Sequence, residues 1–86
     1  MPGFEDKIRS GVYETKLLYK DNREAYREDQ RNLTHQFYAD AEEFVIQSGV
    51  PQQYAAKVVS RAWSNGHSCG FSEVLNCLYN LIEIFT

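Results

Sequence analysis

The chain has 86 residues, with nine Lys and Arg against twelve Asp and Glu and a formal net charge of −3. A chain of this length forms a single domain over residues 1–86 and buries only about 60–65% of its unfolded surface. The mild acidity excludes a strong overall attraction for nucleic acid and the charge density of a strong DNA mimic. No apolar run approaches the roughly 18 residues that a membrane span needs, so we expect no membrane partner.

The N-terminus and the cysteines indicate a cytoplasmic protein. Residues 1–6 lack the basic and apolar regions of a secretory signal peptide. In a reducing compartment Cys69 and Cys77 stay as thiols. Eight positions apart on one helix face, they would lie about 12 Å from each other, which is too far for a disulfide.

Residues 1–20 are predicted to form an N-terminal arm outside the main helices. Residues 1–11 show little periodicity, as in a loose terminal segment. Residues 12–19 alternate in polarity, and a lone strand has no partner here. We expect an extended segment laid across the helices, or an edge contributed to another copy. The more apolar set of this segment consists of Tyr13, Thr15, Leu17 and Tyr19.

Residues 22–48 are predicted to form one long helix. Residues 21–24 resemble a helix start, with Asp21 as an acidic cap and Glu24 three positions later. Gly49 ends the helix, and Pro51 prevents its continuation. One stripe of the helix carries Tyr26, Leu33, Phe37, Ala41, Phe44 and Val45.

Residues 52–85 are predicted to be helical, as one continuous or slightly kinked helix or as a pair broken near 66–70. The apolar positions before the glycines are Tyr54, Ala55, Val58, Val59, Ala62 and Trp63. Those after them are Phe71, Val74, Leu75, Leu78, Ile82 and Phe85. Gly66 could cap a first helix, but Ala62, Gly66 and Gly70 recur every fourth residue and lead into Val74. Because the stripe keeps its phase, we favour continuity.

The expected fold is therefore all-α, a helical hairpin of two long helices with an extended N-terminal arm. Small residues at every fourth position would let another helix approach closely.

The pentapeptide from Gly66 to Gly70 matches the G-x-S-x-G signature of a serine hydrolase, with Ser68 in the nucleophile position. That signature works where a buried strand turns sharply into a helix, and its triad needs a histidine after the nucleophile. Here the preceding residues have helical periodicity, and the other histidine, His35, lies upstream. We therefore predict no enzyme activity, no catalytic residue and no cofactor.

A metal site is also considered, because four ligand types lie close together in the sequence. Zinc sites use short spacings that let the ligands converge. An eight-residue helical gap cannot close one tetrahedral site without His35 or a second chain. We therefore predict no metal, with the two thiols packed as small buried hydrophobes. The residues considered are His67, Cys69, Glu73 and Cys77.

The polar pair His67 and Ser68 lies beside glycines within an apolar segment, where polar groups need hydrogen bonds. One interpretation has the imidazole bonded to a carboxylate or carbonyl of the first helix, which would determine how the helices meet. The other assigns the pair to partner binding. With Trp63 and Phe71, it is predicted to lie at the helix–helix or subunit contact.

Basic residues recur every three or four positions from Lys16 onward. They form a solvated face if the neighbouring acidic residues pair with them. The functional alternative is a contact for an acidic partner or for a phosphate backbone, with nearby tyrosines as a stacking surface. The basic stripe is Lys16, Lys20, Arg23, Arg27 and Arg31, the acidic residues are Glu24, Glu28 and Asp29, and the tyrosines are Tyr13, Tyr19 and Tyr26.

Aromatic residues exceed what a two-helix hairpin can cover. An exposed aromatic surface usually marks a protein interface. We therefore predict self-association, as a homodimer or a larger oligomer. The aromatic residues in question are Tyr38, Tyr54, Trp63, Tyr79 and Phe85.

Residues 62–76, AWSNGHSCGFSEVLN, together with the preceding YRED of residues 26–29, resemble a group of short helical proteins of tailed bacteriophages and prophages. These proteins share a C-terminal AW…GHSxGxxEV block after a charged helix. The resemblance implies a phage accessory or early protein in the bacterial cytoplasm and brings no catalytic residues.

From these observations we expect a non-enzymatic protein that binds and modulates a bacterial host protein, with inhibition favoured. Its outward partner surface would be Arg23, Arg27 and Arg31. The alternative is an accessory protein of nucleic-acid machinery that uses the same basic stripe.

Overall fold

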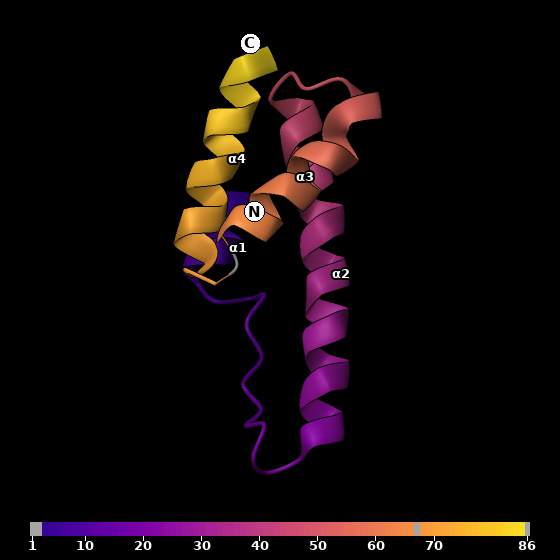
Figure 1. Cartoon of the computed structure of the whole chain (residues 1–86), viewed down its shortest axis with the longest axis vertical. Helices are drawn as coiled ribbons and strands as arrows, with labels where there is room; N and C mark the ends of the chain where they lie inside the picture. The colour runs from indigo at the N-terminus through magenta and orange to yellow at the C-terminus, as the bar shows by residue number, and fades with distance from the viewer. Residues whose placement is uncertain (1–2, 67, 86) are drawn as a thin grey trace.

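The computed structural model describes residues 3–66 and 68–85, and these contain four α-helices and no strand. The predicted all-α class is confirmed, with 74% of the residues in helices. The helices are α1 (Phe4–Arg9), α2 (Arg23–Gln47), α3 (Gln52–Gly66) and α4 (Phe71–Phe85). Figure 1 shows α2, α3 and α4 running up, down and up again, with the first half of α2 extending below the other helices.

The long helix α2 lies where the sequence predicts it, from Arg23 to Gln47. Its N-cap is Asn22 rather than Asp21, because the Asn22 side chain accepts a hydrogen bond from the Ala25 amide at 3.1 Å. The chain leaves the helix through Gly49, which has a φ of 113°. Only glycine adopts this conformation without strain.

Of the two forms predicted for residues 52–85, the favoured continuous helix is wrong and the helix pair broken near 66–70 is confirmed, because α3 ends at Gly66 and α4 begins at Phe71. Gly70 has a φ of 103°, and its carbonyl accepts the first hydrogen bond of α4, from the Val74 amide at 3.3 Å. The chain reverses, so Val74 packs against Gly66 instead of extending its stripe. A Cβ atom on Gly66 would lie 2.6 Å from the Val74 nitrogen. The predicted close approach of a neighbouring helix is found at Gly66, whereas Gly70 provides the positive φ of the turn before α4.

The core lies among α1, α3, α4 and the second half of α2, with α3 packed against both α2 and α4. Phe37 is fully buried at its centre and is surrounded by other aromatic rings. The ring centroids closest to that of Phe37 belong to Trp63 at 5.1 Å, Tyr13 at 5.4 Å and Phe71 at 5.6 Å. Other buried core positions are Ala41, Val45, Val58, Val59, Ala62, Val74, Leu75, Leu78 and Ile82.

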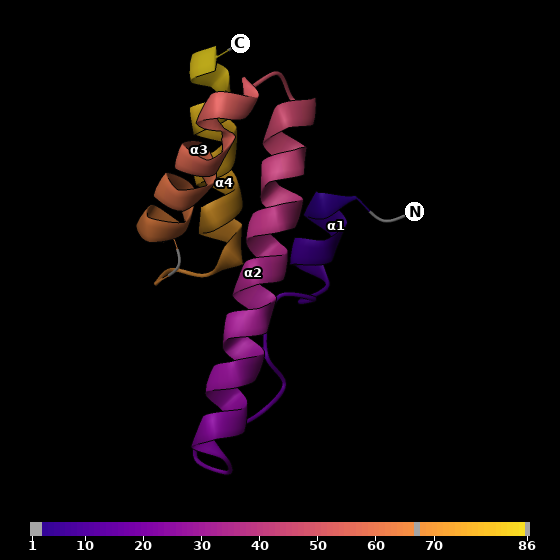
Figure 2. The same cartoon turned by 90° about the vertical axis from the view of Figure 1, so that its right-hand side faces the viewer.

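The prediction of a loose terminal segment over residues 1–11 is wrong for residues 3–11. Helix α1 contacts both α2 and α4, and Figure 2 shows it on the far side of α2 from α3. The Phe4 ring lies 5.0 Å from that of Phe44, and Ile8 is buried. These apolar contacts give a six-residue helix the tertiary support that it lacks on its own.

Tyr13 attaches the arm to α2. Its ring is 2% exposed, and its hydroxyl donates a hydrogen bond to Asp40 Oδ2 at 2.6 Å. The Lys7 ammonium lies 3.5 Å from the same oxygen. Of the more apolar set expected in residues 12–19, only Tyr13 is buried, and Leu17 and Tyr19 stay exposed. After Tyr13 the chain runs beside the first half of α2 (Figures 1 and 2).

The Tyr13–Asp40 pair predicts a pH dependence of stability. Burial, the hydrogen bond to Asp40 and the charge of Asp40 raise the pKa of Tyr13 above its ordinary value of 10.0. Burial alone would raise the pKa of Asp40, but the hydrogen bonds from Tyr13 and Gln36 and the Lys7 charge lower it below 3.8. Stability from Asp40 is therefore present above pH 3.8 and is lost as the pH falls through its lower folded-state pKa. Stability from Tyr13 is present below pH 10.0 and is lost as the pH rises above it.

Replacement of Tyr13 by phenylalanine is expected to lower the free energy of unfolding by about 1–2 kcal/mol at neutral pH, since a hydrogen bond to a charged group is lost. The loss should shrink below the ordinary pKa of Asp40, where the unfolded carboxylate is already protonated. Urea unfolding at several pH values measures both effects. Tyr19→Phe removes the hydroxyl of an exposed tyrosine and serves as the control; an equal loss in both variants would contradict the prediction.

Candidate functional site

The first half of α2, residues 23–35, projects beyond α3 and α4 (Figures 1 and 2). The buried residues of α2 are Phe37, Ala41 and Val45, all in its second half. Extending their face towards the N-terminus by the helical period leads to Tyr26, Gln30 and Thr34. The face that makes the core therefore continues onto a helix half that α3 and α4 do not cover.

Two adjoining hollows share Gln30: one lies on the surface of α2 itself, and the other lies between α2 and the nearby ends of α3 and α4. We call their combined lining the notch. The first hollow is lined by Tyr26, Arg27, Gln30, Arg31, Thr34, His35 and Tyr38. The second is lined by Gln30, Trp63, Gly70, Phe71 and Val74. Both hollows open to solvent.

The charges of the notch are of one sign. Its eleven lining residues include two arginines, one histidine and no Asp or Glu. The chain as a whole has a net charge of −3, so the positive charge of this surface is opposite in sign to that of the whole protein. Its other side chains are mainly aromatic. The notch thus combines apolar rings with a positive rim.

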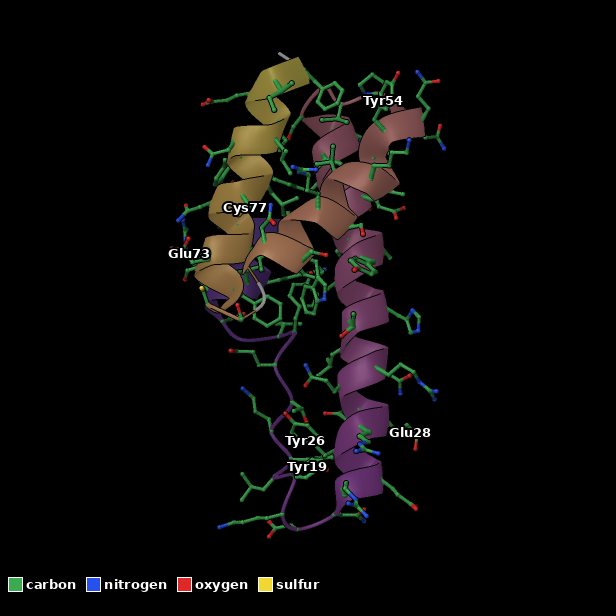
Figure 3. All side chains as sticks on the ribbon, viewed as in Figure 1. Tyr19, Tyr26, Glu28, Tyr54, Glu73 and Cys77 are labelled. Carbon is green, nitrogen blue, oxygen red and sulfur yellow. The ribbon has the colours of Figure 1, made fainter. Side chains whose placement is uncertain are left out.

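Arg27 is positioned by tyrosines at the lower edge of the notch. Its Nη2 donates to the Tyr19 hydroxyl at 3.4 Å, and its guanidinium carbon lies 5.8 Å from the centre of the Tyr19 ring. Tyr19 meets Tyr26 edge to face, with ring centroids 5.6 Å apart. Figure 3 shows both tyrosines between α2 and the preceding segment, whereas Glu28 points away on the other side of the helix.

The pairing expected within the basic stripe is absent from the described part of the chain. Ion pairs there join Lys7 to Asp40 and Arg9 to Glu5. None joins Arg23, Arg27 or Arg31 to the neighbouring carboxylates. The guanidinium groups of Arg27 and Arg31 therefore remain available to an outside anion.

Trp63 and Phe71 have two roles in the structure. Both are half-buried, and their ring centroids lie 5.7 Å apart beside Phe37. Tyr38 approaches Trp63 with a centroid separation of 6.0 Å. These rings belong to the contact among α2, α3 and α4, and their outer surfaces line the notch.

The remaining predicted site residues lie away from the notch lining. Arg23 is exposed at the start of α2, one helical turn before Arg27. Ser68 is exposed between α3 and α4, and its Oγ lies 4.0 Å from Cys69 Sγ. His67 lies outside the described residues. The structure thus brings together Arg27, Arg31, Trp63 and Phe71, but not Arg23 or Ser68.

The surroundings of Ser68 differ from those of a hydrolase nucleophile, since the residue follows an α-helix rather than a buried strand. The expectation of two buried thiols is wrong for Cys69, which is exposed, whereas Cys77 is half-buried. Among residues 3–66 and 68–85, no three His, Cys, Asp or Glu side chains gather as metal ligands would.

Sequence reasoning did not assign Gln30, Thr34, Gly70 or Val74 to a binding surface. A signal for Gln30 and Thr34 was present, because each lies seven residues before a core position of α2, Phe37 and Ala41. Gly70 and Val74 gave no such signal, because they reach the notch only through the reversal between α3 and α4.

The fold and the notch together define a small all-helical protein with a cationic, aromatic surface on a projecting helix. In the described part of the chain, no helix is both long enough and apolar enough to cross a membrane. The chain belongs to the family of unknown function DUF8546, whose model matches residues 4–85. Comparison with curated proteins and with solved structures returned no match.

Proposed function

We propose that this protein is a non-enzymatic interaction protein that binds another protein through the notch. The proposal rests on one observation: two arginines and several aromatic rings lie together in the notch, on a face of α2 that α3 and α4 do not cover. Arginine and aromatic residues are enriched at protein interfaces and supply most of the binding energy there. A partner seated in the notch would extend the packing of α2 beyond the body of the protein.

The partner class that we propose is a bacterial host protein, bound and modulated in the cytoplasm, with inhibition favoured. The resemblance of residues 62–76 to phage and prophage proteins supports this part of the proposal. The open form of the notch supports protein binding in general, because protein surfaces meet over broad shallow areas.

Self-association is proposed at a second surface, at the other end of the bundle. Tyr54 and Phe85 pair there with ring centroids 5.5 Å apart, yet they remain 41% and 38% exposed. Ile84 beside Phe85 is 74% exposed. Burying these side chains between two copies would remove apolar area from water.

Replacement of both Arg27 and Arg31 by alanine is expected to weaken partner binding at least about tenfold, because two cationic contacts are lost at once. The measurement is titration calorimetry with the partner captured from a bacterial lysate. Both side chains are exposed, so the helical circular dichroism should not change.

The matched control is Lys57→Ala with Arg61→Ala. This double variant removes the same charge from exposed positions of α3 that do not line the notch. Equal affinity of the Arg27/Arg31 variant and the wild-type protein would contradict the proposal, as would an equal loss in both double variants.

A second candidate function is binding of nucleic acid, favoured by the arrangement of Arg27 with Tyr19 and Tyr26. Aromatic rings beside arginine can stack on exposed bases. A mobility shift at low salt that disappears in an Arg23/Arg27/Arg31 triple-alanine variant would support this candidate. No shift at any salt concentration would remove it.

A further inference from the structure

We infer that the notch recognises an acidic amphipathic helix, with apolar side chains on one face and Asp or Glu along the adjacent edge. The inference rests on the proposed function and specifies the chemistry of the partner. It follows from the shape, the apolar lining and the charge of the notch.

The shape of the notch suits a helix. In the body of the protein, α3 packs against α2 over Phe37, Ala41 and Val45. Beyond α3 the same face of α2 continues through Tyr26, Gln30 and Thr34, which are half-buried, with Tyr19 against Tyr26. A second helix can lie there as α3 does above, in the helix-in-groove mode of peptide recognition. Residues 23–35 span about 18 Å, which corresponds to roughly three turns of a bound helix.

The apolar lining supplies anchoring sites at the end of the notch nearest the body. Trp63 and Phe71 are half-buried there and are supported from behind by Phe37, so their outer surfaces are held in place. Tyr38 extends this aromatic surface along α2. Leucine or phenylalanine side chains of a partner helix would bury apolar area against these rings.

The positive charge of the notch favours a partner helix that carries carboxylates along the edge facing the arginines. Arg27, Arg31 and His35 follow one another every fourth residue, so they lie along one line on α2. No carboxylate lines the notch, and neither arginine has an ion-pair partner among the described residues. Carboxylates at positions i and i+4 of a bound helix would meet Arg27 and Arg31 together.

The distribution of charge favours such a short acidic segment over a nucleic acid. Outside the notch, Arg27 and Arg31 also line a hollow with Glu24 and Glu28, and the chain as a whole is acidic. A phosphate backbone continuing past the notch would meet these negative charges. A short acidic helix, in contrast, can place its carboxylates opposite Arg27 and Arg31 alone.

The test uses fluorescein-labelled synthetic helical peptides of about four turns, each with Leu and Phe on one face. The probe peptide has Glu at i and i+4 along the adjacent edge. A matched peptide has Gln at the same positions, and a scrambled peptide keeps the composition of the probe without its periodicity. A single-stranded oligonucleotide of similar charge is the fourth ligand. Fluorescence anisotropy at low and high salt measures the binding of each to the full-length protein.

We expect the Glu peptide to bind about five to ten times more tightly than the Gln peptide at low salt, because two exposed ion pairs are gained. This advantage should shrink at high salt through screening. It should also disappear in the Arg27→Ala/Arg31→Ala protein and persist in the Lys57→Ala/Arg61→Ala protein. The scrambled peptide should bind weakly to all three proteins.

Equal affinity for the Glu and Gln peptides, or no binding of either, would overturn the inference. Tighter binding of the oligonucleotide than of the Glu peptide would overturn it in favour of nucleic acid. A sedimentation mass of the protein alone that falls in the Arg27/Arg31 variant would overturn it in favour of a second copy. The proposed function fails separately, if the same variant still binds the captured host protein with unchanged affinity.

Discussion

Replacing Phe37 by alanine is expected to lower the free energy of unfolding by about 3–5 kcal/mol, the usual cost of removing a fully buried aromatic ring. Phe37 is 0% exposed and contacts rings from four other parts of the chain. Its neighbours are Phe4 of α1, Trp63 of α3, Phe71 of α4 and Tyr13 of the arm. The cavity would therefore loosen every packed element at once.

This loss is a large share of the roughly 5–15 kcal/mol that stabilises a small domain, so the variant should unfold at a much lower urea concentration than the wild-type protein. Urea unfolding followed by circular dichroism measures the shift of the midpoint. Tyr54→Ala is the matched control, since it removes an aromatic ring that is 41% exposed. A cost below about 1 kcal/mol for Phe37→Ala, or a cost equal to that of the control, would contradict the central role of this ring.

Replacing Gly66 by alanine is expected to cost about 2–3 kcal/mol, at the upper end of the usual range for overpacking. The new Cβ would lie 2.6 Å from the Val74 nitrogen, 2.8 Å from its Cα and 2.9 Å from the Glu73 carbonyl carbon. All three are backbone atoms, so α4 as a whole must move away from α3. The higher helix propensity of alanine offsets only about 1 kcal/mol of this cost.

Alanine variants at two other glycines serve as controls, because they separate the effect of steric clash from the effect of backbone conformation. Gly70 has a φ of 103° but nothing within 4 Å of a Cβ, so Gly70→Ala should cost less, about 1 kcal/mol, through strain alone. Gly3 has open space and no such φ, so Gly3→Ala should be neutral. Thermal unfolding should place the variants in that order, with a shift of roughly 10 °C for Gly66→Ala. A Gly66 variant as stable as the Gly3 variant would contradict the close approach of α3 and α4.

The features predicted correctly depend on residues that are close in the sequence. The span of α2 follows from its stripe, from a polar cap near its start and from Gly49 and Pro51 at its end. The capping bond from Ala25 to Asn22 joins residues three positions apart. Such interactions are readable in a short window because they do not require knowledge of the fold.

The features predicted wrongly depend on residues that are distant in the sequence. Tyr13 belongs to the core because its hydroxyl reaches Asp40, which lies 27 positions further along the chain. Nothing in residues 1–20 reports that contact, so the sequence predicts an extended segment around Tyr13 without its burial. The sequence leaves one helix or a pair broken near 66–70 open for a related reason: a four-residue spacing from Ala62 to Val74 is compatible with one helix and with two helices folded against each other.

The candidate site likewise has parts that the sequence predicts and parts that depend on the fold. The arginines of the stripe and the pair Trp63 and Phe71 were predicted as two separate contacts. The structure unites Arg27 and Arg31 with Trp63 and Phe71 through the shared lining residue Gln30. It also shows that the expected intrahelical ion pairs of the arginines do not form among the described residues.

The all-α class, the bounds of α2 and the apolar faces of the later helices follow from local sequence patterns, because helix formation and capping are local. Three features depend on long-range packing: the chain reverses between Gly66 and Phe71, Tyr13 joins the core, and arginines and aromatic rings meet in one notch. Periodicity specifies which face of a helix is buried. Only the packing of the helices specifies what that face meets, and how much of it remains uncovered.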